Sequence, residues 1–153
     1  MGASSNVTSN AGFEVVITRI FDAPRSLVFR AWTDPEMLLR WFGPKDFTAT
    51  IIQNDARTGG EYHFHMRGPN YDDHWKGVYR EVVPPERIVF TWPAGPDSIV
   101  TVTFEDLDGK TRLTLHHGKF ETVAARDNHE RGWGSSLECL ADYLADYLKV
   151  AHE

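Results

Sequence analysis

The hydrophobic period changes near Phe120, and that change constrains the fold more than any other feature of the sequence. From Asp46 to His117 apolar and polar residues alternate and Gly, Pro and Asp interrupt them often, a pattern typical of antiparallel strands. After Phe120 the apolar residues recur every three or four positions, as on one face of a helix. The chain therefore predicts an antiparallel sheet followed by one long C-terminal helix, which must bury its apolar face.

About six strands are expected between Asp46 and His117. Asp108-Gly109 supplies the positive-φ pair of a tight hairpin, while Gly-, Pro- and Asn-rich stretches, among them Ala94-Gly95-Pro96, separate the other strands. The expected strands run approximately over Phe47–Asn54, Glu61–Arg67, Trp75–Val83, Arg87–Trp92, Ser98–Glu105 and Arg112–His117.

The segment before this meander predicts one strand and two short helices. Phe13–Phe21 is rich in β-branched and aromatic residues and is expected to be a strand. Asp22 followed by Pro24, and Asp34 followed by Pro35, each predict a helix start with an Asp cap. The two helices are expected over Arg25–Thr33 and from Glu36 to about Trp41, the second ending at Gly43-Pro44.

The C-terminal helix has an apolar face, and two glycines interrupt it. Gly132 and Gly134 lower helix propensity by roughly 1 kcal/mol each, so they predict a kink or a close approach to the sheet beside Trp133. The apolar face consists of Trp133, Leu137, Leu140, Ala141, Leu144 and Leu148.

Composition excludes several classes of partner. The chain has 153 residues and a formal net charge of -6, which argues against binding to nucleic acid or to an anionic membrane. Its single cysteine, Cys139, cannot form an internal disulfide, and no signal-like apolar segment opens the chain, so we expect a cytoplasmic protein. Residues 1–12 are expected to be a flexible leader and residues 13–150 a single domain.

Several ordered sequence strings resemble a known family. The chain is similar to AHSA-type proteins (activator of heat-shock chaperone ATPase homologues) of the START and polyketide-cyclase-like (SRPBCC) superfamily. The resembling strings are Arg19–Pro24, Val28-Phe29, Trp32–Glu36, Arg40–Pro44, Gly59-Gly60, Met66–Pro69, Gly77–Tyr79, Val83–Trp92 and His129–Trp133. The resemblance implies an α+β helix-grip fold, in which a curved antiparallel sheet of about seven strands wraps the last helix and leaves a cavity between them. Where relatives often have a compact turn, this chain reads Gly68–His74, and we expect a rim loop there that is particular to its ligand.

Aromatic residues are the first candidates for a binding site. The chain has 9 Phe, 5 Tyr and 5 Trp, and many fall on one face of an expected strand or on the helices that close the sheet. Core packing explains any single ring, but a sheet wrapped around one helix leaves inner surface for a ligand. The candidate ligand-binding residues are Trp41, Tyr62, Phe64, Met66, Trp75, Tyr79, Phe90, Trp92, Trp133 and Leu137.

Histidines are the alternative source of chemistry. His63 and His65 share one face of a strand, opposite Tyr62 and Phe64, so they face either solvent or the cavity and are within reach of one ion. The chain has no metal motif such as H-E-x-x-H, and no nucleophile elbow, so we predict neither a metal nor a cofactor and assign no catalytic residue.

The main functional prediction is binding of a small, mostly apolar or aromatic molecule between sheet and C-terminal helix, for sequestration, sensing or simple cavity chemistry. The first alternative is the protein-interaction role that the AHSA resemblance implies, with a chaperone as partner. The second is a metal-assisted enzyme that uses His63 and His65. A weak homodimer also stays open.

Overall fold

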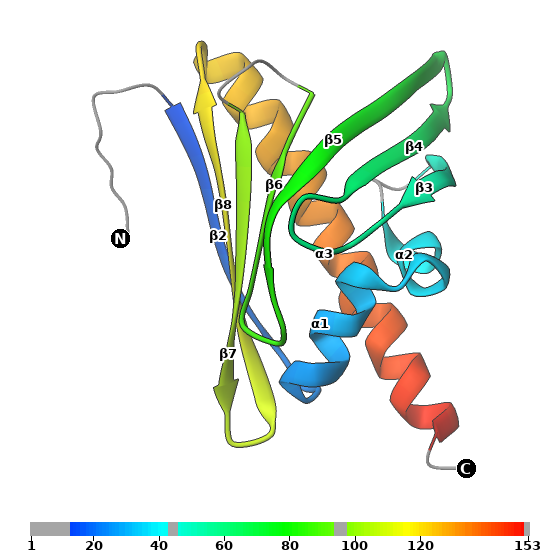
Figure 1. Cartoon of the computed structure of the whole chain (residues 1–153), viewed down its shortest axis with the longest axis vertical. Coiled ribbons are helices and arrows are strands. Elements are labelled where there is room, and N and C mark those ends of the chain that lie inside the picture. The colour runs from blue at the N-terminus through cyan, green and yellow to red at the C-terminus, as the bar shows by residue number, and fades with distance from the viewer. Residues whose placement is uncertain (1–12, 43–45, 94–97, 152–153) are drawn as a thin grey trace.

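A seven-stranded antiparallel sheet carries the fold in the computed structural model, which describes residues 13–42, 46–93 and 98–151. The strands lie in the order β2-β8-β7-β6-β5-β4-β3. Their bounds are β2 Phe13–Phe21, β3 Thr48–Asn54, β4 Glu61–Gly68, β5 Tyr71–Val83, β6 Arg87–Thr91, β7 Ile99–Leu107 and β8 Lys110–Phe120. The sheet curves around the long helix α3 (Val123–Ala151), as Figure 1 shows, and this confirms the predicted α+β helix-grip fold.

Two short helices follow β2 and pack beside α3: α1 (Arg25–Thr33) and α2 (Pro35–Trp41). The predicted cap of α2 is confirmed, because the Asp34 carboxylate accepts a hydrogen bond from the Glu36 backbone N–H at 3.0 Å. The predicted cap of α1 is wrong. Pro24 is the N-cap residue, and no side chain in the described part of the chain caps the helix. Asp22 therefore lies two residues before the cap, where it cannot reach the N–H groups of the first turn.

Strand β5 changes partner halfway along its length. Residues 71–78 pair with β4, whereas residues 79–83 pair with β6, and the register shifts between Tyr79 and Glu81. Strands β3 and β4 and residues 71–78 of β5 therefore diverge from the rest of the sheet, and we call them the wing (Figure 1). This divergence is what opens space beside α3.

The turn between β4 and β5 is tighter than predicted. Gly68 pairs directly with Tyr71, and Asn70 adopts a φ of 60°, a conformation that Asn tolerates better than most residues. The loop expected over Gly68–His74 is therefore wrong for residues 71–74, which belong to β5. By contrast, the predicted Asp108-Gly109 hairpin is confirmed, with φ values of 52° and 93°.

Helix α3 runs without interruption through the two glycines that predicted a kink or a close approach. A Cβ atom added at Gly134 would meet no atom of the described residues within 4 Å, so close packing against the sheet does not require this glycine. None of the helices in the described ranges is long and apolar enough to cross a membrane. The predicted leader 1–12 and the turns predicted at Gly43-Pro44 and Ala94-Gly95-Pro96 lie outside the described residues.

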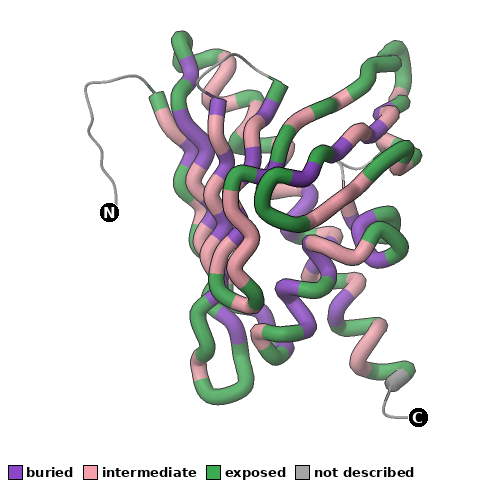
Figure 2. Tube along the Cα trace, viewed as in Figure 1, coloured by how far each residue is buried: buried purple, intermediate pink, exposed green. Residues whose placement is uncertain are grey.

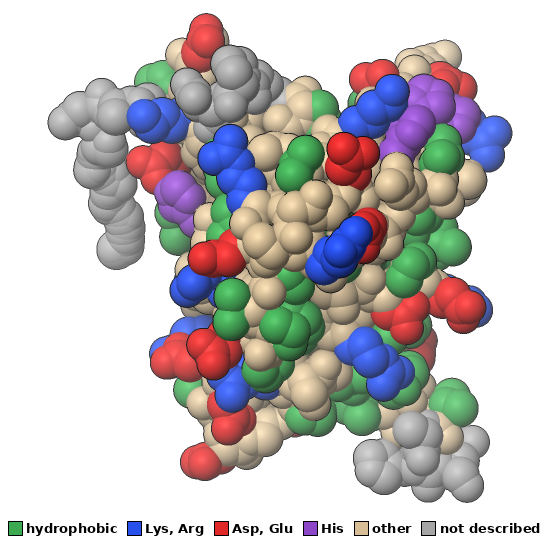
Figure 3. Space-filling model, in the orientation of Figure 1, with side chains coloured by type: hydrophobic (Ala, Val, Ile, Leu, Met, Phe, Trp, Pro, Cys, Tyr) green, Lys and Arg blue, Asp and Glu red, His purple; other side chains and the backbone are tan. Residues whose placement is uncertain are grey.

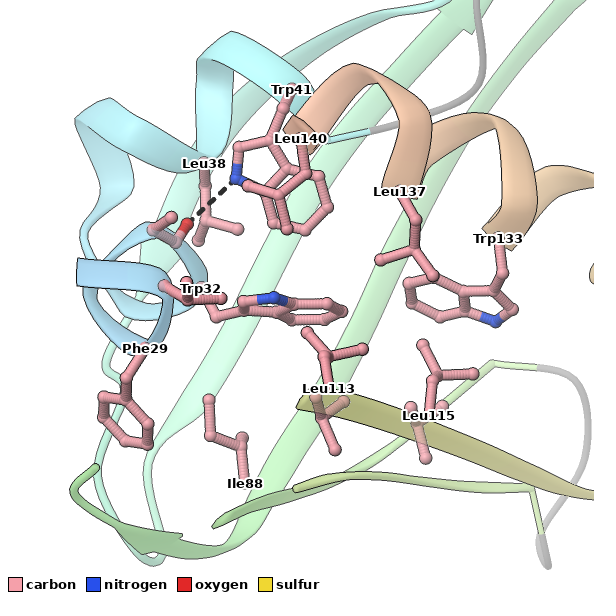
Figure 4. Close-up of a cluster of buried hydrophobic side chains, with 14 of the residues drawn as sticks. Phe29, Trp32, Leu38, Trp41, Ile88, Leu113, Leu115, Trp133, Leu137 and Leu140 are labelled. Atoms are coloured by element: carbon pink, nitrogen blue, oxygen red, sulfur yellow. Dashed lines mark hydrogen bonds between the residues drawn. The ribbon is translucent and has the colours of Figure 1, made fainter. Parts of the chain in front are cut away.

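The hydrophobic core fills the space between the sheet and the helices. Buried residues alternate with more exposed ones along most of β4 and β8, so each strand presents one face to the core (Figure 2). Leu137 and Leu140 of α3 point toward Leu113 and Leu115 of β8, with the Trp32 ring between the two layers (Figure 4). All four leucines are fully buried, and each such side chain stabilises the fold by about 1.5–3 kcal/mol.

Candidate ligand-binding cleft

A cleft with a volume of about 530 Å³ opens where the wing leaves the sheet. Its walls come from β5, from the end of α2, from the segment after β6 and from the N-terminal half of α3. A volume of this size is typical of small-molecule sites, which run from about 300 to 1,000 Å³. The lining residues are Phe42, Phe47, Tyr71, Asp73, Trp75, Trp92, Pro93, Asn128, His129, Arg131, Gly132, Trp133 and Ser136.

Aromatic rings form a continuous wall of the cleft. The Trp92 ring centroid lies 5.2 Å from that of Trp75 and 5.0 Å from that of Trp133, so indoles from β5, from the segment after β6 and from α3 are in contact. Phe42 lies 6.2 Å from both Trp75 and Trp133. The Trp75 indole N–H donates to the Tyr71 hydroxyl at 2.8 Å, which orients both rings on the same face of the wing. The edge-to-face contacts of Phe42 and the tilted contacts of Trp92 hold the wall in one arrangement.

Polar groups of α3 and β5 border the aromatic wall. Asp73 comes from the wing, and Asn128, His129, Arg131 and Ser136 come from α3. The His129 ring contacts the Ala125 carbonyl through Nδ1 at 2.9 Å, so Nδ1 carries the proton and donates. In the neutral ring Nε2 is then left as an acceptor. The cleft thus combines a large apolar wall with a few hydrogen-bonding groups that can orient a ligand.

A buried histidine supports the cleft from behind. The Trp133 indole N–H donates to Nδ1 of His117 at 3.1 Å, and an indole nitrogen can only donate. The His117 proton therefore sits on Nε2, which donates to the Ser98 hydroxyl at 2.7 Å. Desolvation by burial, with smaller contributions from His129 and His116, lowers the pKa of His117 to about 3. His117 is neutral at physiological pH, and it fixes the orientation of the Trp133 ring.

The candidate residues from the sequence divide between the cleft and the core. Trp75, Trp92 and Trp133 line the cleft. Beside it lies a separate cavity of only about 20 Å³, room for one water molecule, and Trp32 is one of its lining residues. The buried indole nitrogen of Trp32 has no hydrogen-bond partner among the residues that the structure describes. The candidates Tyr62, Phe64, Tyr79 and Phe90, with Trp92, border that small cavity, and Trp41, Met66 and Leu137 are packed in the core.

Several cleft residues were not among the predicted ones. Phe42, Tyr71 and His129 come from positions where no strand alternation was expected, so periodicity could not assign them to a face. Phe47 was expected to open a strand, but that strand begins at Thr48. His117 did carry a usable signal. It follows Leu113 and Leu115 at a spacing of two, and this spacing places it on the buried face of β8.

The two faces of the wing differ in burial. Tyr62, Phe64 and Met66 are buried on the inner face, so the alternation places His63 and His65 on the outer face, away from the cleft. There His65 contacts the Asp72 carboxylate at 2.8 Å, and this hydrogen bond lowers the pKa of Asp72. The histidine pair therefore does not contribute acid or base groups to the cleft.

A curved antiparallel sheet around a long C-terminal helix, with an aromatic cleft between wing and helix, defines an α+β protein of the helix-grip class. Residues 22–145 match the family described as "Activator of Hsp90 ATPase homolog 1-like protein", and the chain belongs to that family. The resemblance of the N-terminal and central sequence strings is thereby confirmed.

Solved structures agree with this assignment. A protein of Chromobacterium violaceum is 30% identical, with a TM-score of 0.77 over 84% of this chain and 94% of its own. The AHSA1 protein from Silicibacter pomeroyi is 28% identical, with a TM-score of 0.77 over 87% of this chain and 98% of its own.

Curated relatives are longer than this chain. The human activator of 90 kDa heat shock protein ATPase homolog 1 is 28% identical over 110 residues, which are 66% of this chain but only 30% of the human protein. The mouse protein of the same name is 27% identical over the same shares. The match therefore spans less than a third of the length of these relatives. The activity of the whole relatives does not transfer to this chain on this similarity alone.

Proposed function

We propose that the cleft binds a small, mostly apolar molecule, for sequestration, for sensing or for simple chemistry at its polar rim. The observation that carries the proposal is the wall formed by Phe42, Trp75, Trp92 and Trp133 around a space of about 530 Å³. Rings inclined to one another in this way offer both faces and edges to a bound molecule, which suits an aromatic or polycyclic ligand. Asp73, His129 and Arg131 then supply the few polar contacts that orient it.

The proposed ligand contacts differ in part from the residues that the sequence predicted. Trp75, Trp92 and Trp133 stay in the proposed contact set, joined by Phe42 and Tyr71. The predicted residues behind the cleft act as support, because they hold the inner face of the wing against the core.

A fluorescence titration tests the proposal directly. Anilinonaphthalene sulfonate, an apolar aromatic probe with one anionic group, is added to the full chain while probe emission and energy transfer from tryptophan are recorded. We expect saturable binding with one probe per chain. The Trp75→Ala variant, which removes part of the wall on the half-buried wing strand, is expected to weaken binding by about tenfold, since an aromatic contact and its buried area contribute about 1–2 kcal/mol.

Tyr143→Ala is the matched control. Tyr143 is a half-buried aromatic residue that lines a shallow hollow with Arg40, Cys139 and Tyr147, on the C-terminal half of α3. Loss of this ring is expected to leave probe affinity unchanged. Equal weakening by both variants, or the absence of saturable binding to the unmodified chain, would overturn the proposal. Native mass spectrometry of protein from its own host then identifies a copurified ligand.

A second candidate function comes from the curated relatives, whose name describes activators of the 90 kDa heat shock protein ATPase. For this chain we infer a protein-interaction role of the same kind as the alternative. The test is a pull-down with that chaperone and a measurement of its ATPase turnover with and without this chain. Stimulation that persists in Trp75→Ala would separate this role from ligand binding. If the chain neither binds the chaperone nor stimulates its ATPase, the protein-interaction role is overturned.

A further inference from the structure

The outer face of the wing carries a cluster of histidines that the cleft does not use. His63 and His65 lie on β4, and Asp72 and His74 lie on the facing half of β5. Figure 3 shows histidine side chains gathered at the end of the wing, with Lys, Arg, Asp and Glu side chains around them. The four residues alternate with inner-face residues, so all of them project to the same outer side.

Strand register brings these side chains together. His65 is directly opposite His74, and neighbours in this position have Cβ atoms about 4.5–5.5 Å apart. Asp72 is the diagonal neighbour of His65, and His63 is the diagonal neighbour of His74. Both diagonal pairs are in contact. His65 Nε2 lies 2.8 Å from Asp72 Oδ1, and His63 Nε2 lies 2.8 Å from His74 Nδ1. The His65 and His74 rings stack with centroids 4.3 Å apart.

We propose that His65, His74 and Asp72 form a binding site for a divalent transition-metal ion, with zinc as the representative ion. The ligand atoms that these residues offer all lie within 4.8 Å of one another. A tetrahedral zinc ion holds nitrogen and carboxylate ligands at about 2.0–2.2 Å, which places any two ligand atoms about 3.3–3.6 Å apart. The three side chains therefore need to close by up to about 1.5 Å, which rotation about their side-chain bonds supplies.

The donor set matches this class of ion. Imidazole nitrogen binds zinc, copper and nickel ions well, whereas magnesium and calcium ions are bound by oxygen ligands. His63 is placed as a positioning residue, because a ligating histidine usually makes a hydrogen bond through its other ring nitrogen. Three protein ligands leave the fourth tetrahedral position to water or to an external ligand. Bound metal would join β4 to β5 on the outer face of the wing, whose inner face borders the cleft.

Two cations border the cluster and limit its affinity. Lys76 is directly opposite His63, and Arg67 is directly opposite Asp72. Their charges repel a divalent ion, while the Asp72 carboxylate attracts it. The site is also exposed, so we expect weaker binding than at a buried structural zinc site. Removal of one of these cations is expected to tighten binding, a result that a purely structural histidine cluster would not produce.

Isothermal titration calorimetry with zinc chloride on the full chain tests the site. We expect one zinc per chain, about tenfold or greater weakening in His74→Ala and in His65→Ala, and tighter binding in Lys76→Gln. His116→Gln is the matched control, since His116 is a half-buried strand histidine that contacts the Glu14 carboxylate but belongs to the far side of the sheet. This variant is expected to bind zinc as the unmodified chain does.

Nuclear magnetic resonance of the unmodified chain keeps the test independent of whether a variant folds. Zinc is expected to shift the imidazole nitrogen resonances of His65 and His74 and to leave those of His116 and His129 in place. Absence of saturable zinc binding, equal loss of affinity in His74→Ala and His116→Gln, or zinc shifts centred on other histidines would each overturn the proposed site.

Discussion

Nδ1 of His117 on β8 accepts a hydrogen bond from the indole N–H of Trp133 on α3, at a nitrogen-to-nitrogen distance of 3.1 Å. This bond joins the helix to the sheet behind the cleft wall. Because Trp133 can only donate, a proton on Nδ1 would eliminate the bond and place two donors against each other. The neutral state of one buried histidine therefore supports the position of a cleft residue.

The first prediction concerns the pH dependence of stability. The pKa of His117 is about 3 in the folded protein and 6.5 in its ordinary state, so between these values the unfolded chain binds a proton that the folded chain does not. Stability from this group is present above about pH 6.5 and is lost as pH falls. The loss amounts to as much as about 1.4 kcal/mol per pH unit. Urea unfolding at pH 7, 6 and 5 measures this slope.

Comparison of two histidine variants isolates the contribution of His117. His117→Gln is expected to reduce the slope between pH 6.5 and 5, whatever its effect on stability at pH 7. His116→Gln changes a neighbouring histidine that is partly exposed, and it is expected to retain most of the slope. If both variants keep the slope of the unmodified chain, burial of neutral His117 does not determine the acid sensitivity.

A second prediction uses two glycines with opposite surroundings. Tyr62 lies directly across from Gly77, and a Cβ atom at Gly77 would lie 2.5 Å from the Tyr62 ring. The ring passes over this glycine and its hydroxyl donates to the Thr91 carbonyl, linking β4 to β6 across β5. Gly77→Ala is expected to destabilise the protein by about 1–3 kcal/mol, because the ring must move.

Gly134→Ala is the matched substitution, since a Cβ atom there would lie more than 4 Å from every residue that the structure describes outside the helix's own turn, and Gly134 lies inside α3. Better helix propensity is expected to stabilise the protein by about 0.5–1 kcal/mol. Chemical denaturation of both variants decides the matter: stabilisation by Gly77→Ala would show that the Tyr62 ring does not require the glycine.

A third prediction concerns the cap of α2. Asp34→Ala removes the acceptor for the Glu36 N–H and is expected to lower the free energy of unfolding by about 1 kcal/mol. Asp22→Ala, at the exposed residue that the sequence pattern wrongly predicted as a cap, is expected to change it by less than about 0.5 kcal/mol. Thermal unfolding compares the two, and an equal loss in both would contradict the assigned caps.

A fourth prediction tests a buried link between the β2–α1 junction and the sheet. The Thr111 hydroxyl donates to the Ala23 carbonyl at 2.8 Å, and Thr111 is fully buried. Thr111→Val is expected to cost about 1–3 kcal/mol, because the carbonyl is left without this partner. Thr103→Val removes a longer, 3.5 Å contact at a half-buried position and is expected to cost less. Urea midpoints that rank the variants in the opposite order would contradict this view.

Most of the fold could be predicted because local periodicity encodes it. Alternation in β7 and β8 and the spacing of Trp133, Leu137, Leu140 and Leu144 in α3 correctly indicated which side chains are buried. Asp34-Pro35 and Asp108-Gly109 correctly marked a helix start and a hairpin, since capping and positive φ depend on neighbouring residues only.

The candidate site was less predictable, because contacts between distant elements define it. Pattern analysis could place Tyr62, Phe64 and Met66 on one face, but it could not distinguish a face that borders a cleft from one that borders the packed core. It also left open whether His63 and His65 face the cavity. The burial of their neighbours decides that question only once the wing is positioned against α2 and α3.

The residue pattern alone determines the order of the elements, which side chains of a strand share one face and the apolar face of the C-terminal helix, because these depend on residues close together in the chain. Which strand face turns inward on the wing, and where space remains, depend on the tertiary structure. Strand β5 exchanges β4 for β6 as its partner near Tyr79, and this exchange turns the wing away from the sheet and opens the aromatic cleft. The tight turn at Asn70 likewise sets the register that brings His65 opposite His74 on the other side of the wing.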